Sequence, residues 1–160
     1  MDTIEKRLSI LTRHINHVAE DCEKLGKKMI ENGDTAVGLS LIANGKIHDN
    51  SKFYGIEWEY LNNDVRPIPA GQDLFQKAVH EHVTKNKHHP EAWPNGIHGM
   101  DKLHLAEMVC DWHARSSEQG NCLFDWIHTV AMKKFGFKKD DLPYTKIMLL
   151  IEDLLERKFV

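Results

Sequence analysis

The segment KIHDNSKF, residues 46–53, places His48 next to Asp49 and adds Lys52 three positions later. Neighbouring side chains on a helix point about 100° apart, so this pair forms no surface stripe. Both side chains can still converge on one point beyond the helix end. A divalent metal ion is such a point, because it binds imidazole nitrogen and carboxylate oxygen together. Taken alone, the pair also fits an ordinary polar helix end.

A second candidate lies near the N-terminus. His14 comes three residues after Leu11 and four residues before Val18, so it faces the predicted core. His17 lies one turn further along the same helix edge and is the alternative ligand. A single inward histidine is also typical of an ordinary core residue, so its interpretation depends on the other candidates.

A third group of histidines ends a predicted helix in the middle of the chain. His82, His88 and His89 can reach a common metal ion from one helix edge and its terminus, with Asn86 as a partner of a ligand. A solvated polar helix tail is the alternative interpretation. His80 lies on another face and is predicted to be exposed.

Carboxylates line the helix predicted to begin at Asp101. Glu107, Asp111 and Arg115 follow one another at i,i+4 spacing beside an apolar series, so the two acidic side chains are expected to be half buried. A buried carboxylate needs a cation or several hydrogen-bond donors. Arg115 can supply that cation to Asp111 in a salt bridge, and a metal ion is the alternative.

The elements that must position these residues follow helical spacing. Apolar residues recur at steps of three and four, whereas strand alternation and internal repeats are absent, so the predicted class is all-α. Helices are predicted from Ile4 to a stop at Asn32-Gly33, from Thr35 to His48, over 73–87, from Asp101 through Ala114, over 123–135 and from Pro143 to 159, with loops at 62–71 and 88–100. Gly38 and Gly45 are expected to weaken the second helix.

Composition limits the function classes. The 160 residues, 41% of them hydrophobic, suit one domain over residues 1–160. A net charge of −3 offers no broad basic field for nucleic acid or an anionic membrane. Cys22, Cys110 and Cys122 are few and unpaired in spacing, as in a reduced cytoplasmic protein. Since no apolar run approaches 18 residues, we expect a soluble protein without a membrane partner.

The combined pattern resembles the HD-domain metal-dependent phosphohydrolase superfamily. The motifs that carry this likeness are RHINHVA, HDNSK, H-x5-HH and the late Asp111. The stretches HDNSKF, NKHHPEAW and LAEMVCDWHARSSEQG are also similar to a small uncharacterised HD-like family of bacteria and phages, over about residues 10–126. The resemblance implies a single-domain bundle of about six helices around a metal site.

The resemblance also implies a ligand set for two divalent ions. One ion would be held by His14, His48, Asp49 and Asp111, and Asp49 would bridge to a second ion held by His82 and by His88 or His89. Members of the superfamily bind manganese, iron, magnesium, zinc or other divalent ions. The many histidines here favour a transition metal (Mn, Fe, Co, Ni or Zn) over magnesium.

The function that these expectations favour is hydrolysis of a small phosphate ester, first of all a nucleotide, by a nucleotidase or phosphodiesterase. Asp49 would be the central catalytic residue, Lys52 and Arg115 the phosphate contacts, and whichever of His88 and His89 binds no metal the acid. Bacterial 5′-deoxynucleotidases of the superfamily carry an acidic residue in place of Lys52. Lysine after His-Asp is common in the dinuclear phosphodiesterase-like branch.

Two alternatives stay open at this point. HD-domain diiron oxygenases use the same kind of six-ligand set, and they differ by oxygen uptake and an iron requirement. A non-catalytic protein that binds a nucleotide or a partner would gain stability from metal without any turnover. The sequence leaves the native metal and homo-oligomer formation undecided.

Overall fold

The computed structural model of the chain describes residues 3–63 and 68–159, and every regular element in these ranges is helical. The all-α prediction is confirmed for this part of the chain. The helices are α1 (Ile4–Glu31), α2 (Thr35–Lys46), α3 (Gly55–Leu61), α4 (Ile68–Lys85), α5 (Lys102–Gln119), α6 (Leu123–Trp126), α7 (Met132–Phe135) and α8 (Leu142–Leu155). Short 3-10 turns cover Asn50–Phe53, Pro90–Ala92 and Gly96–Gly99, and a π turn, Ile127–Ala131, joins α6 to α7.

Helix α1 carries the buried stripe that its sequence predicts. The hydroxyl of Thr3 caps its first turn by accepting a hydrogen bond from the backbone N–H of Lys6 at 3.3 Å. The buried stripe includes Leu11, His14, Val18, Cys22 and Leu25. His14 therefore lies inside the protein with the apolar residues of the same face.

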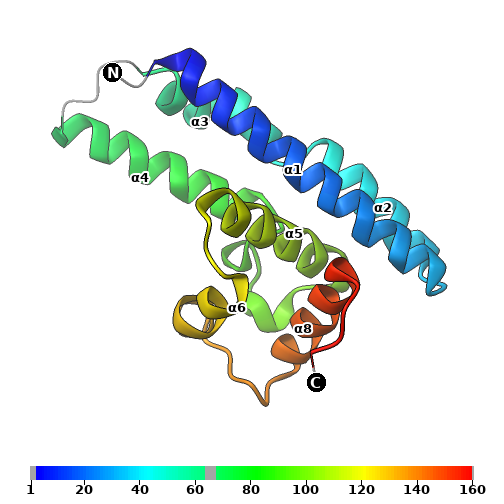
Figure 1. The fold of residues 1–160 in the computed structure, drawn as a ribbon. Helices are drawn as coiled ribbons and strands as arrows, with labels where there is room; N and C mark the ends of the chain where they lie inside the picture. The colour runs from blue at the N-terminus through cyan, green and yellow to red at the C-terminus, as the bar shows by residue number, and fades with distance from the viewer. Residues whose placement is uncertain (1–2, 64–67, 160) are drawn as a thin grey trace.

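Helices α1 and α2 run side by side after the turn that joins them (Figure 1). A Cβ atom on Gly38 would lie 2.5 Å from the carbonyl oxygen of Gly26, and one on Gly45 would lie 2.6 Å from the Cβ of Cys22. Glycine therefore permits the close approach of the two helices, and this packing offsets the low helix propensity that was expected to weaken α2. The approach brings His48, just beyond α2, beside α1.

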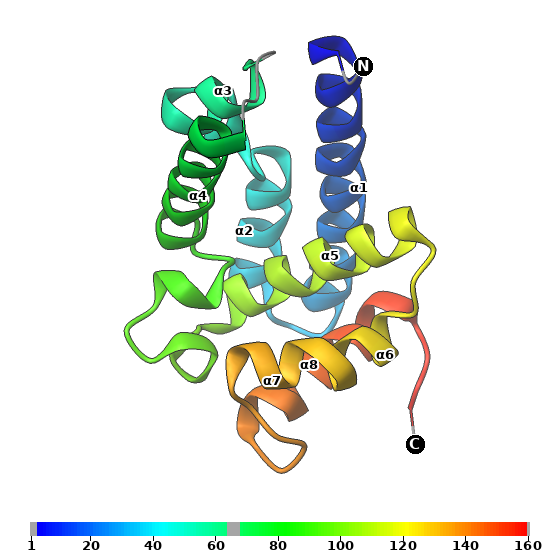
Figure 2. The same cartoon turned by 90° about the vertical axis from the view of Figure 1, so that its left-hand side faces the viewer.

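Helix α5 crosses α1 and α2, and α6, α7 and α8 lie on its other side (Figure 2). A shared core joins these helices in one unit, with Leu25 and Met29 from α1, Leu41 from α2, Leu105, Met108 and Val109 from α5, and Ile147, Ile151 and Leu154 from α8. Cys22 and Cys110 are buried in this core, whereas Cys122 is exposed. In the described ranges, no helix combines the length and apolar character needed to cross a membrane.

The structure differs from the prediction in one additional helix and in several helix ends. Helix α3 lies in a stretch where no element is predicted, and α4 begins at Ile68, inside the predicted loop 62–71. Pro69 falls in the first turn of α4, where a proline removes no intrahelical hydrogen bond. The last helix ends at Leu155 because Glu156 adopts a left-handed backbone conformation with φ 53°.

Candidate metal centre

Asp49 lies at the centre of the predicted constellation. Its Oδ1 is 3.5 Å from Nε2 of His48, 3.3 Å from Nε2 of His82 and 3.4 Å from Nε2 of His88. The carboxylate is buried, and the residue has φ 55°, a left-handed conformation that is uncommon outside glycine. This turn ends the α2 segment and directs Asp49 inward, and such strained positions cluster at functional sites.

Asp111 of α5 forms a second carboxylate position. Its Oδ1 lies 2.9 Å from Nε2 of His14 and 3.9 Å from Nε2 of His48, and its Oδ2 lies 3.9 Å from Nε2 of His88. The structure thus brings together side chains from α1, from the end of α2, from the segment after α4 and from α5. His14, His48, Asp49 and Asp111 meet in one region, as the sequence predicts.

Both members of the histidine doublet point into the same region. The ligand atoms of Asp49, His82, His88 and His89 lie within 4.8 Å of one another, and a second set with this property comprises His14, His48 and Asp111. The sequence left open whether His88 or His89 is the ligand. The geometry places both of them within reach of one metal ion. The chain leaves its helical path after Lys85, and this allows two consecutive imidazoles to face one centre.

The fit of these side chains to a metal ion can be judged from their unpaired atoms. In the part of the chain that the structure describes, the buried atoms without a hydrogen-bond partner are His48 Nε2, Asp49 Oδ1, His88 Nε2 and His89 Nε2. Leaving such polar atoms buried and unpaired costs about 1–3 kcal/mol each. All four residues belong to the groups of converging ligand atoms that could hold a metal ion, and one bound cation would satisfy several of these atoms together.

Glutamates on the far side of the imidazoles fix the orientation of the rings. Nδ1 of His48 lies 3.0 Å and Nδ1 of His88 lies 3.3 Å from Oε1 of Glu107. Glu57 pairs with Nδ1 of His82 at 2.6 Å, and Glu118 pairs with Nδ1 of His14 at 3.1 Å. An Nδ1–H that donates to a carboxylate leaves Nε2 as the free donor atom for a metal, which is the arrangement typical of metal-binding histidines.

These glutamates carry incomplete signals in the sequence. Spacing predicts Glu107 only as a half-buried carboxylate, and it does not point to Glu57, which lies on the unpredicted helix α3. Glu118 was also missed, although it follows Asp111 by seven residues and so lies on the same face of α5. The seven-residue spacing from Asp111, which is two helical turns, is the sequence signal that points to Glu118.

Opposite charges determine the protonation of the cluster. Burial lowers the pKa of His88, but the carboxylates of Asp49 and Glu107 outweigh this effect and raise it to about 10. Burial and the neighbouring imidazoles of His88 and His82 lower the pKa of His89 to about 3. Burial raises the pKa of Asp111, yet the nearby histidines hold it well below the usual range. The carboxylates therefore keep the negative charge that a cation requires.

Lys52 and Arg115, the predicted phosphate contacts, differ in their surroundings. Nζ of Lys52 lies 3.7 Å from Oδ2 of Asp49, so its ammonium group borders the cluster. The exposed guanidinium of Arg115 pairs with Glu118 at 3.4 Å. Of the two alternatives for Asp111, the salt bridge with Arg115 is therefore not formed, because Arg115 pairs with Glu118 and Asp111 faces histidines.

Two other predicted histidines, His17 and His80, lie outside the main cluster. His17 belongs to a second group with Asp21 and His113, in which Nδ1 of His113 lies 2.7 Å from Asp21. His14 is thus the residue of α1 that reaches the main cluster. His80 is exposed, as predicted.

The predicted partner Asn86 and the predicted loop 88–100 can also be placed. The amide of Asn86 donates to the hydroxyl of Ser51 at 3.1 Å and to the carbonyl of His82 at 2.8 Å, so it holds the end of α4 against the turn that carries Asp49. In the loop, Nε2 of His98 lies 3.1 Å from the carbonyl oxygen of Gly136.

Comparison with known protein families places the chain in a family. A model described as "Family of unknown function (DUF5662)" matches residues 3–155. No curated protein and no solved structure matches the chain. The matched range contains all the elements that carry the candidate metal centre.

Proposed function

The chain belongs to the DUF5662 family, and we propose that it is a metal-dependent phosphoric ester hydrolase of the HD-domain type that acts on a nucleotide. The observation that carries this proposal is the convergence of unpaired, buried His48 Nε2, His88 Nε2 and Asp49 Oδ1 beside the ammonium of Lys52. Nitrogen and oxygen donors held in this way bind divalent cations, and an ammonium at the rim complements a phosphate.

The arrangement of the donors supports two ions. One set is His14, His48 and Asp111, and the other is Asp49, His82, His88 and His89. Asp49 is 3.5 Å from the Nε2 of His48 in the first set, so its carboxylate lies between the two sets and can bridge them. The predominance of imidazole favours manganese, iron, cobalt, nickel or zinc over magnesium.

Divalent ions, when bound, polarise phosphate oxygens and lower the pKa of bound water to about 7. The chain's own groups then have separate tasks. The negative charge of Asp49 would hold the two cations close together. Glu57, Glu107 and Glu118 hold the imidazole rings in the orientation that presents Nε2.

Lys52 is the residue that supports a phosphate ester as the substrate. Its Nζ lies at the edge of the cluster and its side chain is 30% exposed, so it can reach both Asp49 and a ligand from solvent. An ammonium donates charge-assisted hydrogen bonds to phosphate oxygens. Arg115 offers a second positive charge near His14 through Glu118, and its role as a phosphate contact is part of the same proposal.

The proposal is tested by metal analysis of the purified protein and by a phosphate-release screen. Protein reloaded with Mn²⁺, Fe²⁺, Co²⁺ or Zn²⁺ is expected to release phosphate from at least one class of nucleoside mono-, di- or triphosphate. His80→Ala, at an exposed position outside the cluster, is the control and should retain the parent rate. Oxygen uptake by the iron form without phosphate release would instead indicate an oxygenase. Metal-dependent stabilisation without either reaction would indicate a binding protein.

A further inference from the structure

We propose that the cavity between α3 and α4 receives the nucleobase of the substrate and binds it by ring stacking rather than by hydrogen bonds to its edges. This inference rests on the proposed function, because it assigns a site to the part of the nucleotide that carries no phosphate. The expected occupant is one flat ring system.

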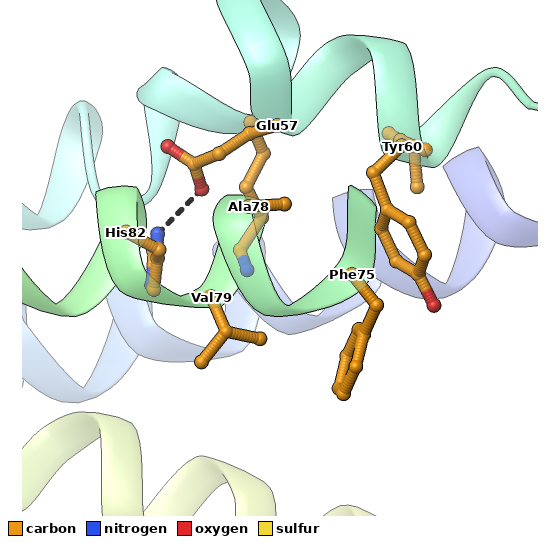
Figure 3. A pocket seen from close by; sticks show the side chains of 8 residues that line it. Glu57, Tyr60, Phe75, Ala78, Val79 and His82 are labelled. Atoms are coloured by element: carbon orange, nitrogen blue, oxygen red, sulfur yellow. Dashed lines mark hydrogen bonds and ion pairs between the residues drawn. The ribbon is translucent and has the colours of Figure 1, made fainter. Parts of the chain in front are cut away.

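The cavity has a polar end and an aromatic end. It encloses about 170 Å³ and is lined by Lys52, Glu57, Tyr60, Leu61, Phe75, Ala78, Val79 and His82. Figure 3 shows the hydrogen-bonded pair of Glu57 and His82 at one end and the rings of Tyr60 and Phe75 at the other, with Val79 between them. The cavity therefore offers charged groups at one end and apolar surface at the other.

The polar end is continuous with the candidate metal centre. His82 lines the cavity and also places Nε2 3.3 Å from Oδ1 of Asp49. Lys52 likewise lines the cavity and has Nζ 3.7 Å from Oδ2 of the same aspartate. A phosphate bound by the ammonium of Lys52 beside Asp49 would thus direct its organic substituent toward the cavity.

The aromatic end suits a flat apolar ring. The rings of Tyr60 and Phe75 have centroids 5.3 Å apart and planes inclined by 47°. Phe75 is 47% exposed and Val79 is 41% exposed, so both present apolar surface that a ring would cover. Base–aromatic stacking strengthens binding by about fivefold to 150-fold per base, which is enough to make the ring a main determinant of affinity.

The size of the cavity limits its occupant. Since one water molecule occupies about 30 Å³ of liquid volume, 170 Å³ corresponds to a handful of waters and admits one ring system. The cavity is therefore matched in size to a single base.

The lining also predicts how the base is read. Glu57 and His82 are paired with each other, and among the lining residues the other polar side chains are Lys52 and Tyr60. A site with few hydrogen-bond partners for a base edge distinguishes poorly between bases, whereas stacking accepts every base. We therefore expect similar affinities for purine and pyrimidine nucleotides.

The test is equilibrium binding to the manganese-loaded full-length protein, measured by calorimetry with ligands that cannot be hydrolysed. Adenosine and cytidine 5′-methylenephosphonates are compared with methylphosphonate, which has no ring. The parent should bind both nucleoside analogues more tightly than methylphosphonate and within about tenfold of each other. Phe75→Ala should weaken both nucleoside analogues by about tenfold and leave methylphosphonate unchanged.

Controls separate loss of the ring site from loss of the fold. Val79→Ala in the cavity should act in the same direction as Phe75→Ala, whereas Val130→Ala, at a valine of equal exposure (41%) outside the cavity, should have no effect. Equal affinity of the parent for nucleoside analogues and methylphosphonate would overturn the inference. So would an unchanged nucleoside affinity in Phe75→Ala, or an equal loss for all three ligands.

This experiment can fail independently of the proposed function. If nucleotides are hydrolysed but Phe75→Ala keeps the parent's affinity for both nucleoside analogues, the hydrolase proposal stands and the ring site is wrong. If the ring-dependent binding is found but no nucleotide releases phosphate, the ring site stands and the hydrolase proposal is wrong.

Discussion

The Nδ1 atom of His48 lies 3.0 Å from Oε1 of Glu107, and this contact directs the opposite ring nitrogen of His48 toward Asp49 and Asp111. Oε1 of Glu107 also lies 3.3 Å from Nδ1 of His88. Its second oxygen accepts a hydrogen bond from the side-chain amide of Asn44 at 3.0 Å. One glutamate on α5 therefore orients two histidines from separate segments.

Glu107→Gln should weaken metal binding without removing a direct ligand. The amide keeps the size of the side chain but loses the negative charge that holds both imidazoles, and changes of this kind reduce metal affinity about 10–100-fold. Competition with a metal chelator measures the affinity. Glu23→Gln, a surface glutamate paired with Lys27, is the control and should keep the parent value. Equal affinity of both variants would contradict the orienting role of Glu107.

Removal of the metal should destabilise the protein. A ligand that binds only the folded state at 100 times its Kd stabilises it by about 2.7 kcal/mol, and each kcal/mol shifts Tm by about 2–4 °C in a protein of this size. Chelator treatment should therefore lower Tm by about 5–10 °C, and added Mn²⁺ or Zn²⁺ should restore it. Thermal unfolding followed by circular dichroism measures the shift. Identical Tm values with and without chelator would show that the cluster binds no ion that stabilises the fold.

The close packing of α1 and α2 should be sensitive to one methyl group. Alanine normally stabilises a helix relative to glycine, but a Cβ at Gly38 would lie 2.5 Å from the backbone oxygen of Gly26. Gly38→Ala should therefore lower the free energy of unfolding by about 1–3 kcal/mol, as in other overpacked sites. Urea unfolding measures this change. Ser40→Ala, exposed on the same helix, should change it by no more than about 0.5 kcal/mol, and a stabilised Gly38→Ala would refute the steric argument.

The sequence contained much of the fold because long helices repeat their apolar positions. The spacing around His14 placed that residue in the core, and the structure buries it. Helix α3 has seven residues, which is too short for a periodic pattern, so the position of Glu57 could not be predicted. Local pattern information therefore located the long elements but not this partner of His82.

The choice between His14 and His17 needed tertiary information. Both lie on the same edge of α1, so spacing treats them alike. Packing of α5 decides between them, because Asp111 meets His14 whereas His113 meets Asp21 beside His17. The order of side chains on the partner helix thus assigns each histidine to its group.

The variants Asp49→Asn and Lys52→Ala should separate metal binding from phosphate binding. Asparagine keeps the shape of Asp49 but removes the negative charge that would attract two nearby cations. Metal content should therefore fall, and phosphate release should decrease by about 10²-fold or more, since each 1.36 kcal/mol lost from transition-state stabilisation costs a factor of ten. Metal analysis and phosphate release on the same preparation measure both effects.

Lys52→Ala should leave the metal content at the parent level, because a protonated ammonium has no lone pair to act as a ligand. Its loss removes a charge-assisted hydrogen bond to the substrate phosphate, which contributes about 1.5–3 kcal/mol, so KM should rise about tenfold or more. The Lys52 side chain is 30% exposed and Asp49 is 5% exposed, so the lysine can be truncated without leaving a buried cavity. If Asp49→Asn kept the full metal content and the parent rate on every nucleotide that the parent cleaves, the His-Asp pair would be an ordinary helix end and the hydrolase proposal would be wrong.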